Sequence, residues 1–195
     1  MNKVEYGLKN IHIAFLDKTV TPNQTTMPAW EEPIAVPGAF QFSLAPAGSA
    51  NNFYGDDGIW FTASAGNNQT GTLQTWFPSP AIKARMLGDY IDDEGKYIQT
   101  ARTGETFAIL GELTGDETNT RFVFYSCTAA RGEFTYDTTP DVPTPTPNSM
   151  PITASSMYFQ PLGVSASGAR VSADKAAIYN DFFDEVVPPS APATP

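Results

Sequence analysis

The sequence predicts a mainly β fold: an antiparallel β-sandwich or partial barrel with one flanking α-helix and extended proline-rich loops. Apolar and polar residues alternate with a period of two through most of the chain, which is typical of half-buried strands. The 15 glycines and 17 prolines interrupt this alternation at short intervals. A complete set of helix start and stop signals occurs in one segment. These three observations favour short strands joined by turns.

The first strand is predicted over residues 10–17, NIHIAFLD. Ile11, Ile13 and Phe15 share one side of the alternation, and His12 lies on the other. A strand with this pattern is expected to bury one face and expose the other.

Two further strand regions are predicted after a proline- and threonine-rich loop at 21–33. Residues 34–44, IAVPGAFQFSL, alternate again, and the Pro-Gly pair in their middle indicates a bulge or bend. The runs IWFTASA and GTLQTWF follow, separated by a Gly-Asn-Asn loop whose residues accept positive φ. We therefore expect a β-hairpin over residues 59–77.

The rest of the chain, from residue 79 onward, predicts helices at two places and strands between them. In 79–88, SPAIKARMLG, a serine caps the helix, a proline occupies its first position and a glycine ends it. Residues 105–113 and 120–137 supply two or three more strands. A second, shorter helix is predicted within 172–183, SADKAAIYNDFF.

The chain is expected to form one domain over residues 1–188. Residues 137–151 place five prolines among threonines, so we expect a loop or extended arm there, because proline lacks the N–H donor that a central strand needs. Residues 189–195 are expected to be a disordered C-terminal tail. The N-terminus has no continuous apolar core of a secretory signal, and no apolar run approaches the roughly 20 residues that span a bilayer. Synthesis in the cytoplasm and no membrane partner are therefore expected.

Composition argues against several classes of function. The formal net charge is -10, and the 11 Lys and Arg residues are scattered along the chain. Such a chain is expected to be repelled by nucleic acid and anionic lipid. Charged residues make up only 16% of the chain, below the roughly 25% of average globular domains. A surface with so few charges is expected to be neutral and polar or to meet another subunit.

Groups that carry side-chain catalysis are scarce. The chain contains one histidine, His12, and one cysteine, Cys127. Cys127 lies in an apolar run and is expected to be a small buried residue. Acidic groups occur at 31–32, 56–57 and 92–94, and adjacent carboxylates of this kind are typical of solvated turns. The sequence therefore predicts no catalytic residue, no cofactor and no metal site.

Several segments together resemble a known family. They are YGLKNIHIAFL, EPIAVPGAFQFSL, FYGDDGIWFTASAGNNQTGTL before the predicted helix, and YNDFFDEVVPP. In this order they resemble the phi13-type family of phage major tail proteins, over residues 4–188. The resemblance implies a structural subunit of a long, non-contractile, siphovirus-like tail. Subunits of that family form hexameric rings, which stack into a tube through which the genome passes.

The resemblance also implies partners and a location. The partners are further copies of the chain, a tape measure protein and other tail proteins, and the location is the virion. Phage DNA is expected to pass through the tube without stable binding. The acidic excess fits this role, because negative charge in a lumen repels DNA phosphates.

Residues for this role follow from position in the predicted strands. Neutral polar side chains and one acidic pair near the predicted hairpin are expected to face the lumen. These are Gln41, Ser43, Asp56, Asp57, Thr62, Ser64, Thr72 and Gln74. Contacts between subunits are expected from the two proline-rich loops. Their candidates are Thr21, Pro22, Trp30, Pro143, Pro145 and Pro147.

Three other interpretations are open at this point, two for the protein and one for the polar sheet face. An acidic β-sandwich with tryptophans such as Trp30, Trp60 and Trp76 is also compatible with a carbohydrate-binding module, in which flat rings stack on sugars. A capsid decoration or baseplate protein is the nearer alternative among virion proteins. An ordinary solvated sheet face is the alternative to a lumen.

Overall fold

The computed structural model describes residues 7–48, 50–55, 58–64, 68–76, 79–115, 119–133, 138 and 146–191, and for 50–55 and 58–64 it gives the course of the backbone. The main element is an antiparallel sheet of eight strands, in the order β2-β1-β9-β10-β11-β6-β3, with β14 paired to β10 beside β11. The strands are β1 (Leu8–Phe15), β2 (Ile34–Ala35), β3 (Ala39–Pro46), β6 (Gln69–Thr75), β9 (Phe107–Leu113), β10 (Arg121–Ala129), β11 (Asn148–Ser155) and β14 (Gly168–Val171). The predicted mainly β class, with a helix beside the sheet, is confirmed.

The sheet curls around a first apolar core. Strands β1 and β3 lie near opposite ends of the strand order and nevertheless contact each other. Their inward side chains meet those of β6, β9, β10 and β11. The members of this core with no more than 1% exposure are Ile13, Phe15, Leu73, Met86, Phe107, Ile109, Cys127, Ile152 and Ala154. Curling thus lets one sheet bury its concave side.

A second apolar core lies on the other side of β1, β9 and β10. Ala14, Ala108 and Tyr125 face it, and the C-terminal segment covers it with Phe182 and other side chains. Ala14 is fully buried. The prediction that the first strand is half-buried is therefore wrong, because a segment distant in sequence packs over its second face.

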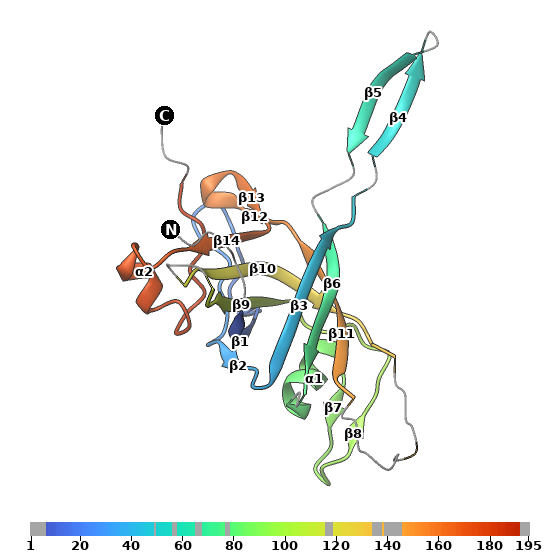
Figure 1. Cartoon of the computed structure of the whole chain (residues 1–195), viewed down its shortest axis with the longest axis vertical. Helices are drawn as coiled ribbons and strands as arrows, with labels where there is room; N and C mark the ends of the chain where they lie inside the picture. Colours follow the sequence, from blue (N-terminus) through green and yellow to red (C-terminus); the bar gives the residue numbers. More distant parts are fainter. Residues whose placement is uncertain are drawn as a thin grey trace.

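The predicted hairpin at 59–77 is also wrong. Strand β5 (Gly58–Ser64) pairs with β4 (Ala50–Gly55), which directly precedes it. Strand β6 has β3 on one edge and β11 on the other, so it offers no edge to β5. Figure 1 shows β4 and β5 as a long hairpin that extends away from the body. The Gly-Asn-Asn loop has the composition of a hairpin turn. The two strands beside it nevertheless do not pair, because β3 and β11 occupy both edges of β6.

Strand β11 corrects the prediction of a loop or arm over 137–151. The strand begins at Asn148 and contains Pro151, which lies opposite Thr72 of β6. The carbonyl of Pro151 accepts a hydrogen bond from the N–H of Ala130, 2.9 Å away, just after β10 ends. The nitrogen and carbonyl of a strand residue point to the same side, so the missing N–H faces the end of β10 and the ladder to β6 loses no donor.

Helix α1 (Pro80–Leu87) forms where the sequence predicts it. Pro80 opens the helix, and Gly88 ends it in the left-handed conformation with φ of 74°. Ser79 occupies the cap position, but its side chain donates or accepts no capping hydrogen bond. Ile82 and Met86 join the first core, so the helix packs its apolar stripe against the interior of the sheet.

Smaller elements surround the sheet. Helix α2 (Ala176–Asn180) is shorter than the predicted segment and begins four residues after Ser172. Two-stranded ribbons form from β7 (Tyr90–Ile91) with β8 (Tyr97–Ile98), and from β12 (Met157–Phe159) with β13 (Val164–Ala166), the latter joined by the 3-10 helix η1 (Gln160–Leu162). In both figures the β7–β8 ribbon and the β4–β5 hairpin lie at opposite ends of the long axis.

Candidate functional site

Four of the predicted lumen residues come together on one sheet surface. Gln41 of β3 lies opposite Gln74 of β6, and Ser43 lies opposite Thr72. The hydroxyl oxygens of Ser43 and Thr72 are 3.2 Å apart, within hydrogen-bond distance. Cross-strand pairs of this kind stabilise a sheet while leaving no charge on its surface.

The alternation of β6 explains why these side chains share a surface. Leu73 and Thr75 are fully buried and point into the first core. Thr72 and Gln74 therefore point outward, because successive side chains of a strand lie on opposite faces. Gly71 brings the backbones of β3 and β6 close together: a Cβ atom there would lie 1.7 Å from the carbonyl oxygen of Ser43.

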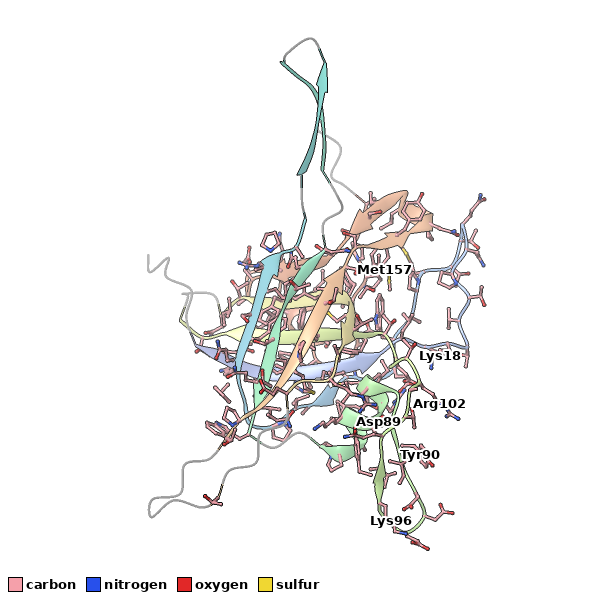
Figure 2. The ribbon with its side chains drawn as sticks, turned by 90° about the vertical axis from the view of Figure 1, so that its right-hand side faces the viewer. Lys18, Asp89, Tyr90, Lys96, Arg102 and Met157 are labelled. Atoms are coloured by element: carbon pink, nitrogen blue, oxygen red, sulfur yellow. The ribbon has the colours of Figure 1, made fainter. Side chains whose placement is uncertain are left out.

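Strand β11 extends the same surface. Ser149 lies opposite Gln74, and Thr153 lies opposite Thr70 of β6 and Thr128 of β10. We call this surface the neutral face and define it by Gln41, Ser43, Thr70, Thr72, Gln74, Thr128, Ser149 and Thr153. Strands β3, β6 and β11 contain no charged residue and no histidine. Figure 2 shows them side by side in one layer.

The β11 members of the neutral face were missed by the sequence interpretation. The cluster of prolines at 137–151 predicts a loop or arm, although the segment SMPITAS alternates from Ser149 onward. The available signal was the alternation of the apolar Met150 and Ile152, which are buried, with Ser149, Pro151 and Thr153, which are half-buried.

The other predicted lumen residues lie elsewhere. Thr62 and Ser64 belong to β5, opposite Asn52 and Ala50 of β4, in the separate two-stranded sheet. They are therefore not part of the neutral face. Asp56 and Asp57 lie outside the described residues.

The predicted inter-subunit residues have varied surroundings. Thr21 and Pro22 are exposed in the loop between β1 and β2, and Pro147 is half-buried directly before β11. Trp30 packs against the second core, and its indole Nε1 donates a hydrogen bond to the carbonyl oxygen of Tyr125 at 3.2 Å. Internal packing thus accounts for Trp30. Pro143 and Pro145 lie outside the described residues.

Charged side chains near helix α1 are engaged in pairs away from the neutral face. The guanidinium of Arg85 donates two hydrogen bonds to Glu31, both 2.8 Å long, and two to Glu105. These bonds hold the pKa of Glu31 below its usual value. Arg85 also lies 3.9 Å from the ring centre of Phe15. The helix is thereby tied to the 17–33 loop and to the segment that leads into β9.

The one histidine and the one cysteine both have structural surroundings. His12 stacks on Phe183 with ring centres 4.6 Å apart, and its Nδ1 is 2.9 Å from the carbonyl oxygen of Asn10. Cys127 is fully buried, as predicted, and burial raises the pKa of its thiol to about 12. A thiol of that kind is a poor nucleophile at neutral pH.

The described residues contain neither a metal-binding cluster nor a membrane-spanning helix. Within the described ranges, no three His, Cys, Asp or Glu side chains are grouped so that they could hold a metal ion. In the same part of the chain, no helix has the length and apolar character needed to cross a membrane. No model of a known protein family matches the chain, and no curated protein is significantly similar to it.

Proposed function

We propose that this protein is the major tail-tube subunit of a long, non-contractile phage tail, and that the neutral face lines the lumen. The observation that carries the proposal is the lack of charge over three adjacent strands in a chain with a net charge of -10. Non-specific DNA binding depends on Lys and Arg side chains that displace counterions from phosphates. A wall of Ser, Thr and Gln has no such cations, so DNA slides past it.

Ring formation is supported by an unpaired strand edge. β3 ends the strand order of the main sheet, and among the strands of the described residues its residues 39–46 pair with β6 alone. Exposed edges of this length invite pairing with another chain. A head-to-tail contact between copies closes into a ring when the rotation between them fits. In this proposal six copies close the ring, and stacked rings form the tube.

The β4–β5 hairpin is the second element that suits assembly. It leaves the body as a two-stranded ribbon (Figure 1). Two-stranded ribbons are marginally stable in water by themselves. In the proposed tube a neighbouring subunit covers this hairpin, and the exposed loop residues Thr21 and Pro22 add further contacts. A tape measure protein and other tail proteins are the further partners in this proposal.

Electron microscopy of the purified full chain at rising concentration tests the proposal. Rings or tubes with a central channel are the expected result, if necessary after addition of tail tips that seed growth. A chain that stays monomeric in the presence of such seeds and that binds sugars on a glycan array would contradict the tail-tube proposal. That result would favour a carbohydrate-binding module.

The exposed tryptophan described in the structure does not form a flat platform by itself. Trp76 is 42% exposed, and its ring stacks on that of Phe40 with centres 4.7 Å apart. One side of each ring is therefore occupied by the other ring. The pair is an exposed aromatic surface, and tryptophan is enriched at protein interfaces.

A further inference from the structure

The β7–β8 ribbon exposes apolar side chains on both of its sides. Tyr90 lies opposite Ile98, and Ile91 lies opposite Tyr97, so each side of the ribbon carries one tyrosine and one isoleucine. Tyr90 is 48% exposed and Ile91 is 40% exposed. A ribbon with two apolar sides suits insertion between two walls better than packing on one flat surface.

The base of this ribbon is held rigidly. The buried carboxylate of Asp89 accepts two hydrogen bonds from Arg131, at 2.9 and 2.6 Å. It also accepts one from the Tyr97 hydroxyl and one from the Thr100 N–H, both at 2.8 Å. A ribbon fixed in this way loses little conformational entropy on binding. Figure 2 shows Asp89 at the base and Lys96 near the tip.

A groove lined by both apolar and polar groups lies at the end of the body from which the β4–β5 hairpin leaves. It has a volume of about 560 Å³ and opens between β3 on one side and β10 with β14 on the other. Phe42 and Leu44 line the first wall, and Phe122 and Phe124 line the second. Leu44 and Gln69 of the lining lie at the end of β3 and β6 from which the β4–β5 hairpin leaves. The groove therefore lies in the body near the base of the β4–β5 hairpin, away from the end that carries the ribbon.

Charges at the two places are complementary. Arg170, which is exposed, is the one charged residue among those that line the groove. The turn at the tip of the ribbon contains Asp92, Asp93, Glu94 and Lys96. Lys96 forms an ion pair with Glu94, and the exposed Asp93 adds to the negative charge of the tip.

From these observations we propose that the β7–β8 ribbon of one copy inserts into the groove of a second copy, with Asp93 next to Arg170. The partner is thus this same chain, joined head to tail along its long axis. Repetition of a head-to-tail contact gives an open line of subunits. The inference rests on the proposed self-assembly and specifies one contact that builds it along the axis.

Charge exchange at the contact is the first test. Asp93→Arg and Arg170→Asp each place like charges together, and each should raise the concentration for half-maximal association, measured by sedimentation velocity, about fivefold or more. In the double variant Asp93→Arg/Arg170→Asp the concentration for half-maximal association should return to within about twofold of the wild-type value. An equimolar mixture of the two single variants should do the same, because each ribbon then meets a groove of opposite charge. Ile178→Ser, an exposed apolar residue of α2, is the matched surface control.

A disulfide between copies is the second test. Asp93→Cys in one preparation and Arg170→Cys in another, mixed under mild oxidation, should give a mixed dimer, and native Cys127 is fully buried and does not compete. If the charge variants associate as strongly as the wild-type chain and no mixed dimer forms, this contact is overturned. The tail-tube proposal is then left standing. Absence of association by the wild-type chain at every concentration, with or without seeds, would overturn both.

Discussion

At the scale of single residues, Asp89 connects helix α1 with the ribbon that follows it. The carboxylate sits one residue after the helix-ending Gly88 and accepts hydrogen bonds from Arg131, Tyr97 and Thr100. These bonds lower the pKa of Asp89 to about 2, with the contribution of Arg131 the largest. The group is therefore charged in the folded protein at every pH at which the protein is expected to function.

Asp89→Asn should lower the free energy of unfolding by about 2 kcal/mol at pH 7, because the charge-assisted bonds to Arg131 are lost. Since the folded-state pKa lies below the unfolded value near 3.8, the Asp89 contribution is present above that value and is lost as the pH falls toward 2. Urea unfolding at several pH values should thus show wild type and variant converging in acid. The exposed Asp93→Asn serves as control, and a pH-independent difference would refute this account of Asp89.

At the scale of elements, β3 and β6 depend on a close backbone approach at Gly71. A Cβ atom at this position would collide with the Ser43 carbonyl of the neighbouring strand. Gly71→Ala should therefore lower the free energy of unfolding by about 2 kcal/mol or more, because the two strands must separate locally. Chemical denaturation measures this, with Thr70→Ala on the same strand as control. Equal stability of the two variants would contradict the described β3–β6 pairing.

A second element-scale prediction concerns the loop between β1 and β2. Lysine cannot reproduce the paired hydrogen bonds that Arg85 donates to Glu31. Arg85→Lys should therefore speed amide hydrogen exchange about fivefold at Glu31 and Asp17, whose N–H groups bond to Phe15 and Ala29. Mass spectrometry of exchanged peptides would detect this. The control variant Arg102→Lys, at an exposed residue, should leave the exchange rates unchanged. The same acceleration in both variants would refute the stabilisation of the loop by Arg85 and Glu31.

The elements that the sequence predicted well are those whose signals are local. The helix at Pro80–Leu87 has its proline and glycine within one segment, and β9 and β10 carry their own alternation. Strand β5 pairs with its direct neighbour β4, whereas β6 pairs with the more distant β3 and β11, so the local turn signal between β5 and β6 misled the prediction. The presence of β11 likewise depends on the distant strands β6 and β10. Four members of the neutral face were found because residues two apart share a side of a strand. Ser149 and Thr153 were missed together with their strand.

At the scale of the whole molecule, the distribution of charge separates one surface from the rest. The neutral face covers β3, β6 and β11, which contain no charged residue, and reaches β10 at Thr128. Ion pairs such as Arg85 with Glu31 and Arg121 with Glu112 lie elsewhere. Two apolar cores on either side of β1, β9 and β10 fix the body that presents this face.

Adding cations to the neutral face tests its role toward DNA. Tubes of Thr72→Lys/Gln74→Lys should retain DNA in a co-sedimentation assay, and retention should fall steeply as salt rises, because lysines that contact phosphates release counterions. Wild-type tubes should retain none. Tyr158→Lys/Ile178→Lys, on exposed positions away from the face, is the matched control. Equal retention by both lysine variants would show that the neutral face does not border the DNA path.

The most direct test of the tail-tube account is a cryo-electron microscopy reconstruction of the assembled full-length chain. The account predicts a hollow tube of stacked six-fold rings in which β3, β6 and β11 form the inner wall, with Ser43 and Thr72 toward the channel. A reconstruction that places these three strands on the outer surface, or particles without a central channel, would contradict it.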